Sequence, residues 1–227
     1  SDKATAWSVR CYHESTLHSR NFFLTLTYRD PAPESLCLPD LQNFFKRLRK
    51  GGCNFRYFGV GEYGSKTRRP HYHAIIFGHD VLEGAQHFGA YWTQDPLCKT
   101  WGHGFVTVAP AEPGSIFYTC GYALKNLGCP DVFHVSSRVP YIGKGWLVKY
   151  YDDICRNGFV TIAGVKYSVP KSYLVRPEYL LEFDGLREAR RVFVDSLSPE
   201  QVWQRRANMP GKEENLRAAV ASARGTL

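Results

Sequence analysis

The 227-residue chain is long enough for one compact domain with a short appendage, and 44% hydrophobic against 22% charged residues exclude wholesale disorder. With 29 basic and 21 acidic residues it carries a net charge of +8, all within residues 1–176, because residues 177–227 hold equal numbers of both. This balance suits a polyanionic partner such as nucleic acid, and it equally suits ordinary solubility charge.

Cysteine use and hydropathy narrow the class of protein further. The seven cysteines are odd in number and none has CxxC spacing, which argues against a zinc ribbon or disulfide scaffold and favours a reducing compartment. No apolar run approaches the roughly 18 residues that cross a bilayer, and no signal-peptide pattern opens the chain. The first residue is Ser1 rather than Met, so we expect the natural N-terminus to have been cut.

The first 51 residues predict a helix, a strand and a second helix. Apolar residues at helical spacing mark residues 3–18, and alternating side chains mark a strand over 21–28. After a Pro-rich loop, residues 39–50 carry an apolar helical stripe, with Pro39 suited to the first turn and Gly51 to the end.

The middle of the chain predicts paired strands and then alternating elements. Strands are expected at 55–63 and 72–77, and the short, basic, turn-rich residues 64–70 between them favour an antiparallel hairpin. The elements expected after the hairpin are a helix around 83–93, a strand over 105–108 and a helix over 115–127.

Beyond residue 128 the patterns are weaker. The expected elements are extended segments at 131–139 and 159–169 and helices at 177–195, 199–207 and 212–223. The whole pattern predicts an α+β fold with a central antiparallel sheet flanked by helices. We place a boundary near residue 175, dividing the chain into a domain over 1–175 and a helical C-terminal extension over 176–227.

Two histidines, His71 and His73, open the predicted strand of residues 72–77. Side chains alternate along a strand, so both imidazoles point to the same face while Tyr72 points to the core. If strand 55–63 pairs back across the turn, Glu62 falls beside them. Two imidazoles and a carboxylate with open water positions make a site for Mg²⁺ or Mn²⁺, and zinc uses the same ligands. The alternatives are partly buried histidines without a metal and a solvent-facing glutamate.

Two tyrosines, Tyr118 and Tyr122, are spaced by four on the predicted helix and so share one face, together with Lys125. Phenols can attack a phosphate, and an ammonium can hold it. The alternative is an aromatic stripe that packs on the sheet. Since a phenol is a poor nucleophile at neutral pH, it needs a polarised phosphate, which a metal site opposite would supply. Lys125 lies one turn from Tyr122, which favours Tyr122 for the first attack.

Together these motifs resemble those of HUH-superfamily endonucleases. The likeness is closest to the rolling-circle replication initiators of small single-stranded DNA phages of the gokushovirus type (Microviridae). Residues 23–28, FLTLTY, resemble the first motif of that family. GEYG at 61–64 with RPHYH at 69–73 resembles its metal motif, and Tyr118-x-x-x-Tyr122 with Lys125 resembles its two-tyrosine motif.

The resemblance spans roughly residues 7–175 and also takes in Trp146 and residues 158–173. Initiators of this type usually carry a Cys-rich segment just before the position of Trp7, and this sequence departs from them there.

The resemblance implies the HUH endonuclease fold and a metal-dependent, sequence-specific nickase and strand transferase that forms a covalent 5′-phosphotyrosine. Tyr118, Tyr122 and Lys125 would then be catalytic, and the two histidines with Glu62 would hold Mg or Mn. It further implies that the partners are single-stranded DNA at a replication origin and the host helicase and polymerase, that no membrane is involved, and that the location is the cytoplasm of the infected bacterial host.

Basic residues near the proposed site are the candidates for DNA contact. Lys66, Arg68 and Arg69 lie in the hairpin turn, and Arg138 is a further candidate for backbone phosphates. A second basic cluster, KRLRK at 46–50, sits where cations ordinarily complement a helix dipole. Unpaired bases would stack on exposed aromatic residues.

Three other functions compete. An HUH transposase or relaxase would use the same chemistry, but single-tyrosine transposases need one phenol and this chain offers a pair. A non-catalytic DNA-binding module of the same fold would not need intact ligands and tyrosines. A cupin-like metal enzyme would need a glycine-rich barrel with more strands.

Overall fold

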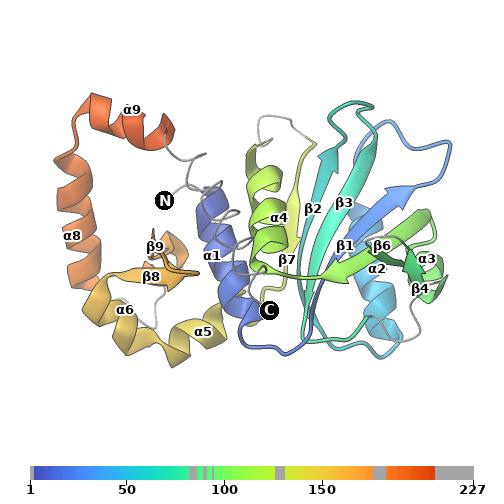
Figure 1. The fold of residues 1–227 in the computed structure, drawn as a ribbon, viewed down its shortest axis with the longest axis horizontal. Coiled ribbons are helices and arrows are strands. Elements are labelled where there is room, and N and C mark those ends of the chain that lie inside the picture. The colour runs from blue at the N-terminus through green and yellow to red at the C-terminus, as the bar shows by residue number, and fades with distance from the viewer. Residues whose placement is uncertain are drawn as a thin grey trace.

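An antiparallel sheet forms the centre of the computed structural model, which describes residues 3–81, 86–88, 91–93, 95–125, 131–175 and 183–207 (Figure 1). Its strands are β1 (Asn21–Tyr28), β2 (Arg56–Tyr63), β3 (Pro70–Phe77), β4 (Gln86–Phe88), β5 (Tyr91–Thr93), β6 (Gly104–Pro110) and β7 (His134–Ser136). Within the described residues the seven strands follow the order β4-β5-β6-β1-β3-β2-β7, and each neighbouring pair is antiparallel. A separate hairpin joins β8 (Phe159–Ile162) to β9 (Val165–Ser168).

Helices cover both faces of the sheet. They are α1 (Lys3–Ser15), α2 (Leu38–Lys50), α3 (Asp95–Trp101), α4 (Pro113–Lys125), α5 (Lys144–Lys149), α6 (Tyr151–Asn157), α7 (Lys171–Leu174), α8 (Asp184–Asp195) and α9 (Pro199–Ala207). Side chains of α2 and α3 pack on one face, and those of α1 and α4 pack on the other (Figure 1). The expectation of an α+β fold with an antiparallel sheet flanked by helices is confirmed.

Strand β1 shows how the sequence pattern assigns the two faces. Its even-numbered side chains, from Phe22 to Tyr28, are buried against α2, while Phe23, Thr25 and Thr27 are half-buried on the other face. Helix α2 meets them with the predicted apolar stripe, because all four of its members are buried. A stripe repeating at three and four residues keeps one helical face on the sheet.

The structure differs from the prediction in residues 83–93. In place of a helix, the described residues there form strands β4 and β5, and Trp92 and Thr93 pair with Val108 and Thr107 of β6. The segment is rich in aromatic and β-branched residues, which favour a pleated surface once a strand edge such as β6 is available. The helix of this region lies later, as α3.

Other predicted elements fit with shifted limits. The helix expected at 115–127 is α4, whose described part ends at Lys125, and the 131–139 segment holds only the short β7. The 159–169 segment turns at Ala163 and Gly164, both with positive φ, and forms the β8–β9 hairpin. The helix expected at 212–223 lies outside the described residues. The short helices α5, α6 and α7 were not predicted.

A second hydrophobic core lies beside the sheet. It gathers side chains from α1, α5, α6, α7 and the β8–β9 hairpin, and it includes the fully buried Val9, Tyr173 and Phe183. Helix α1 therefore contributes to two cores, with Val9 in this one and Cys11 under the sheet. The domain boundary near residue 175 stays a prediction. No helix among the described residues has the length and apolar character that crossing a membrane requires.

Candidate metal centre and catalytic cleft

The predicted hairpin brings three candidate ligands together. In the β2–β3 ladder Glu62 pairs with His71, and His73 follows two residues later on the same face. The ligand atoms of these three side chains all lie within 4.8 Å of one another. Oε1 of Glu62 lies 2.9 Å from Nε2 of His71 and 3.0 Å from Nε2 of His73.

Tyr72 points to the opposite face and fixes the strand there. Its hydroxyl lies 2.7 Å from the hydroxyl of Tyr28 and accepts a hydrogen bond of 2.9 Å from the backbone N–H of Cys37. Because this side chain is fully buried among α2-side residues, the two histidines must face α4. A one-residue slip would exchange these faces, so the Tyr72 anchor also holds the register of the ligands.

The triad is more buried than its position at the strand end predicts. We expected a solvent-facing strand end, but Glu62 is only 5% exposed and His73 is also buried, because α4 packs over β2 and β3. Burial alone would raise the pKa of the Glu62 carboxyl, but hydrogen bonds from His71 and His73 outweigh it and bring the pKa to about 2. Burial likewise opposes the charged form of His71, yet Glu62 and the Arg69 carbonyl leave its pKa raised.

The outer nitrogens of both rings are held in place. Nδ1 of His71 lies 3.2 Å from the carbonyl oxygen of Arg69, and Nδ1 of His73 lies 3.0 Å from Oγ1 of Thr25. A carbonyl only accepts, so the His71 bond requires a proton on Nδ1, and in the neutral ring Nε2 carries a lone pair. Contacts of this kind orient histidines that bind metals through the other nitrogen.

These residues fit a divalent cation. In the neutral ring the His71 Nε2 lone pair faces a carboxylate oxygen, a repulsion that a cation between them would remove. Oε2 of Glu62 is buried and, among the described residues, has no hydrogen-bond partner. A buried carboxylate oxygen left without a partner is costly, and cation binding would satisfy it. Two imidazoles and a carboxylate suit Mg²⁺, Mn²⁺ or Zn²⁺.

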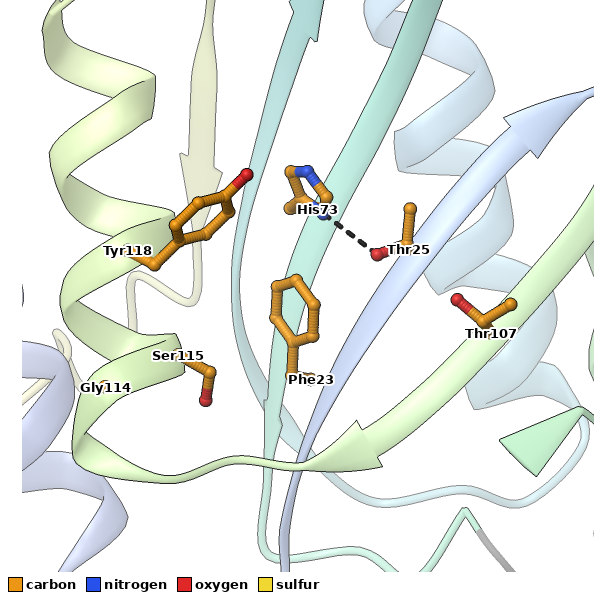
Figure 2. Close-up of a pocket in the computed structure, with 7 residues that line it drawn as sticks. All are labelled: Phe23, Thr25, His73, Thr107, Gly114, Ser115 and Tyr118. Carbon is orange, nitrogen blue, oxygen red and sulfur yellow. Dashed lines mark hydrogen bonds between the residues drawn. The ribbon is translucent and has the colours of Figure 1, made fainter. Parts of the chain in front are cut away.

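A cleft of about 590 Å³ opens beside the triad. Its lining residues come from β1, β3, β6 and α4: Phe23, Thr25, His73, Thr107, Gly114, Ser115 and Tyr118. Figure 2 shows Tyr118 reaching from α4 toward His73 across this space. The ring centroids of these two residues are 5.9 Å apart, and Tyr118 is 36% exposed. The structure thus places one predicted tyrosine beside the predicted metal ligands.

The other two predicted catalytic residues are described only in their backbone. Helix α4 runs through Tyr122 and Lys125, but their side chains lie outside the described residues. The shared face of Tyr118 and Tyr122 therefore stays a prediction from their spacing of four residues.

The predicted DNA-contact residues lie in different places. Lys66 and Arg68 are exposed in the turn beside the triad, where Arg68 stacks on the Tyr63 ring. Arg69 pairs with Asp30 and donates to the carbonyl of Tyr28. Arg138 follows β7, whose partner residues on β2 start at Phe58, so it lies at the end of the sheet away from Glu62.

The second basic cluster, 46–50, is partly consumed by structural contacts. Arg47 donates to the carbonyl oxygens of Thr100 and Trp101 at the end of α3. Arg49 donates to the carbonyl of Phe55 and lies over its ring. These bonds agree with the structural interpretation of the cluster, in which cations satisfy carbonyl groups at helix ends.

The sequence analysis missed the residues that β1 and β6 contribute to the cleft. Thr25 and Thr107 face each other across the β1–β6 ladder, and Phe23 stacks on His73 with a centroid distance of 5.1 Å. The alternation in FLTLTY shows which β1 residues share a face. It does not show that this face adjoins β3, which depends on pairing over about 50 residues.

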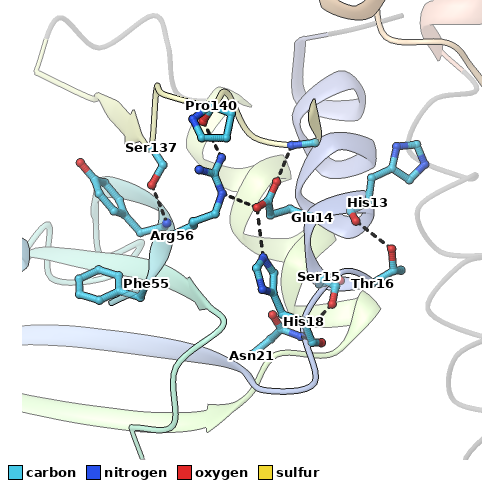
Figure 3. Close-up of polar contacts among 12 residues, drawn as sticks. His13, Glu14, Ser15, Thr16, His18, Asn21, Phe55, Arg56, Ser137 and Pro140 are labelled. Carbon is cyan, nitrogen blue, oxygen red and sulfur yellow. Dashed lines mark hydrogen bonds and ion pairs between the residues drawn. The ribbon is translucent and has the colours of Figure 1, made fainter. Parts of the chain in front are cut away.

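A second buried carboxylate, Glu14 of α1, provides an internal contrast (Figure 3). Its Oε1 accepts hydrogen bonds from Arg56 and from His18, the latter at 3.2 Å, and its Oε2 accepts from the Gly143 N–H at 2.7 Å. Arg56 also donates to the carbonyl of Pro140. Both oxygens of Glu14 are satisfied, so this cluster ties α1 to β2 and to the loop before α5.

Comparison with known proteins relates the chain to phage replication proteins. Residues 21–127, which include both ligand histidines and both tyrosines, match a family model described as a replication-associated protein of the ORF2 type. The chain is 30% identical to replication-associated protein VP4 of Bdellovibrio phage phiMH2K over 207 residues, which cover 78% of this chain and 66% of that protein. It is 32% identical to replication-associated protein ORF2 of Spiroplasma virus 4 over 206 residues, covering 78% and 64%.

A third relative, replication-associated protein ORF4 of Chlamydia phage 1, is 28% identical over 191 residues, covering 73% of this chain and 48% of that protein. The match spans less than two thirds of the length of each of these three relatives. No solved structure matches the chain.

Proposed function

The chain belongs to the family of phage replication-associated proteins, and on that premise we propose that it initiates rolling-circle replication as an HUH endonuclease. In this role it nicks single-stranded DNA at an origin and later rejoins it in the infected bacterial host's cytoplasm, where helicase and polymerase extend the nicked strand. Residues 1–175 would form the endonuclease domain and 176–227 a helical extension.

The observation that carries this proposal is the arrangement of Tyr118 opposite the Glu62–His71–His73 triad. A ring-to-ring distance of 5.9 Å between Tyr118 and His73 leaves room for a phosphate within reach of both the phenol and a metal on the triad. A structural tyrosine on α4 would be expected to pack against the sheet, yet Tyr118 lines an open cleft.

The chemistry required of these residues is transesterification. Mg²⁺ or Mn²⁺ on the triad would polarise the phosphate and favour charge on its oxygens. Oη of Tyr118 or Tyr122 forms a bond to phosphorus as the bond to the 3′ oxygen breaks. The phenol loses its proton and the leaving 3′ oxygen ends as a hydroxyl. The tyrosine then holds the 5′ phosphate, and the phosphodiester energy is kept for rejoining.

Two tyrosines would allow the nicking and closing steps to alternate. The second phenol cuts the regenerated origin while the first still holds the 5′ end, and the new 3′ hydroxyl then attacks the first linkage. Lys125 would hold the phosphate near Tyr122. The hairpin-turn residues Lys66 and Arg68, with Arg69, would hold the DNA backbone near the cut.

The proposal is tested by incubating the protein with a labelled single-stranded oligonucleotide from the phage's own origin region and Mn²⁺. A covalent adduct that resists denaturing electrophoresis is expected, and EDTA should abolish it. Tyr118→Phe and Tyr122→Phe should each retain partial activity, while the double variant should bind DNA and form no adduct.

The matched control is Tyr150→Phe, an exchange of the same chemical kind in the turn between α5 and α6, which should leave adduct formation unchanged. Adduct formation by the double variant would overturn tyrosine catalysis. Full activity in EDTA would overturn the role of the metal. Preference for a hairpin substrate over a linear origin would instead favour the transposase alternative.

A further inference from the structure

The face of the sheet that carries the triad is covered over only half its width. On β2 and β3 this face packs against α1 and α4 through buried side chains such as Val60 and Ile75. On β1 and β6 the same face is lined by Thr25, Thr27 and Thr107, which are only half-buried. The cleft beside Tyr118 is the inner part of this open half.

Phe105 lies at the edge of the open half and is 63% exposed. It pairs with Thr27 in the β1–β6 ladder, and Thr27 in turn pairs with the metal ligand His71 in the β1–β3 ladder. Phe105 is thus in the same cross-strand row as His71, two strands away. At a spacing of about 4.8 Å per strand, the two backbones are about 10 Å apart.

The backbone of Phe105 is held firmly in this position. A Cβ added at the preceding residue, Gly104, would collide with the carbonyl oxygen of Thr27, so only glycine permits this close approach of β6 to β1. The neighbouring Val106 is fully buried on the α2 side, which directs Phe105 to the open face by the alternation of the strand.

We propose that Phe105 is a stacking platform for an unpaired base of the DNA strand whose phosphate lies at the triad. The inference rests on the proposed function for its choice of ligand. A single strand needs both an aromatic surface for its bases and cations for its phosphates. Arg29 supplies a cation at the same edge, because it is exposed and its N–H bonds to the His103 carbonyl, extending the ladder beside Phe105.

The occupant is single-stranded rather than double-stranded DNA, because base pairs in a duplex already stack on one another and their faces are closed. The ligands Glu62 and His73 are also too buried for a rigid duplex to approach, whereas one extended strand can enter the cleft. The +8 charge of the chain favours a nucleic acid over a second copy of the same basic chain.

The experiment measures binding of fluorescein-labelled dT20 in EDTA by fluorescence anisotropy, so that no cleavage contributes. Phe105→Ala should weaken the Kd by about 5-fold or more, the effect of losing one base–aromatic stack. Phe105→Trp should restore binding to the wild-type level. The matched control is Trp203→Ala, which removes another exposed aromatic residue, on α9, and should leave the Kd unchanged.

A labelled 20-base-pair duplex is the second probe, and Phe105→Ala should leave its weaker binding unchanged. An unchanged dT20 affinity in Phe105→Ala, with a native circular dichroism spectrum, would overturn the platform. So would a change in oligomeric state by analytical ultracentrifugation without loss of dT20 affinity, because Phe105 would then contact a second copy.

The two proposals fail separately. A wild-type chain that forms the covalent adduct, but whose dT20 affinity ignores Phe105, contradicts only the stacking platform. A chain that binds dT20 through Phe105 and forms no adduct supports the platform and contradicts the endonuclease. A chain that binds no single-stranded DNA contradicts both.

Discussion

Two buried glutamates, Glu62 on β2 and Glu14 on α1, show what separates a candidate site from a structural cluster. Both are nearly inaccessible to solvent, both contact histidine, and hydrogen bonds outweigh burial to lower the pKa of each. They differ in how many donors surround them. Glu14 has donors for both oxygens, whereas Oε2 of Glu62 has none among the described residues.

This difference teaches that burial and a shifted pKa do not by themselves identify a functional residue. A fully satisfied carboxylate has used its bonding capacity on the fold. A buried carboxylate with an unused oxygen has capacity left for a ligand, at a cost in stability that the fold must bear. The comparison predicts that substitutions at the two glutamates have opposite profiles of activity and stability.

The largest expected effect is on the activity of a Glu62→Gln variant. Losing a charged ligand removes the metal that polarises the phosphate, so adduct formation should fall by about a thousandfold, or about 4 kcal/mol of barrier. The melting temperature in EDTA should stay close to that of the wild type. A variant that is fully active, or that fails to fold, would break the comparison from the Glu62 side.

Glu14→Gln should show the converse profile. It leaves the largely buried guanidinium of Arg56 without its carboxylate, and breaking such a pair costs about 3–5 kcal/mol of stability. Urea unfolding measures this loss. Adduct formation per folded molecule, assayed below the unfolding transition, should match that of the wild type. A specific loss of activity without loss of stability would place Glu14 in the site.

A smaller effect is expected at Thr25, which orients the second ligand. Thr25→Val removes the hydroxyl next to Nδ1 of His73 and should weaken Mn²⁺ binding by about 10- to 100-fold, as calorimetry would measure. Thr25→Ser should restore the affinity. Thr27→Val, two residues along the same face, is the control and should leave Mn²⁺ affinity unchanged. Equal Mn²⁺ affinities for Thr25→Val and the wild type would refute this role.

The smallest effect concerns His13, the neighbour of Glu14. Its ring is stacked on Trp146, and burial lowers the pKa of His13 to about 3, against about 6.5 in an unfolded chain. The unfolded state therefore binds a proton that the native state refuses. Stability should fall as pH drops from about 6.5 toward 3, by at most about 1.4 kcal/mol per pH unit.

Urea unfolding at a series of pH values checks this dependence. His13→Phe removes the titrating group, so its stability should be flatter across this pH range whatever its absolute value. A slope identical to that of the wild type would assign the pH dependence to other groups.

How much of this was predictable depended on the range of the interactions. The Glu62–His71–His73 site could be predicted because a short turn joins its two strands and the pleat fixes their faces. The roles of Thr25 and Phe105 could not, since they depend on β1 lying between β3 and β6. The error at 83–93 has the same origin, because Trp92 and Thr93 form a strand against an edge supplied by β6.

The position of α1 has a consequence for how the chain acquires its structure during synthesis. This helix leaves the ribosome before every element it packs against, yet Glu14 bonds to Gly143 and His13 contacts Tyr173. At about 5–20 residues per second, the helix waits on the order of ten to thirty seconds for these partners. During that interval Val9, Cys11 and Ala4 have no core to enter, so the nascent chain exposes an apolar helix that chaperones can recognise.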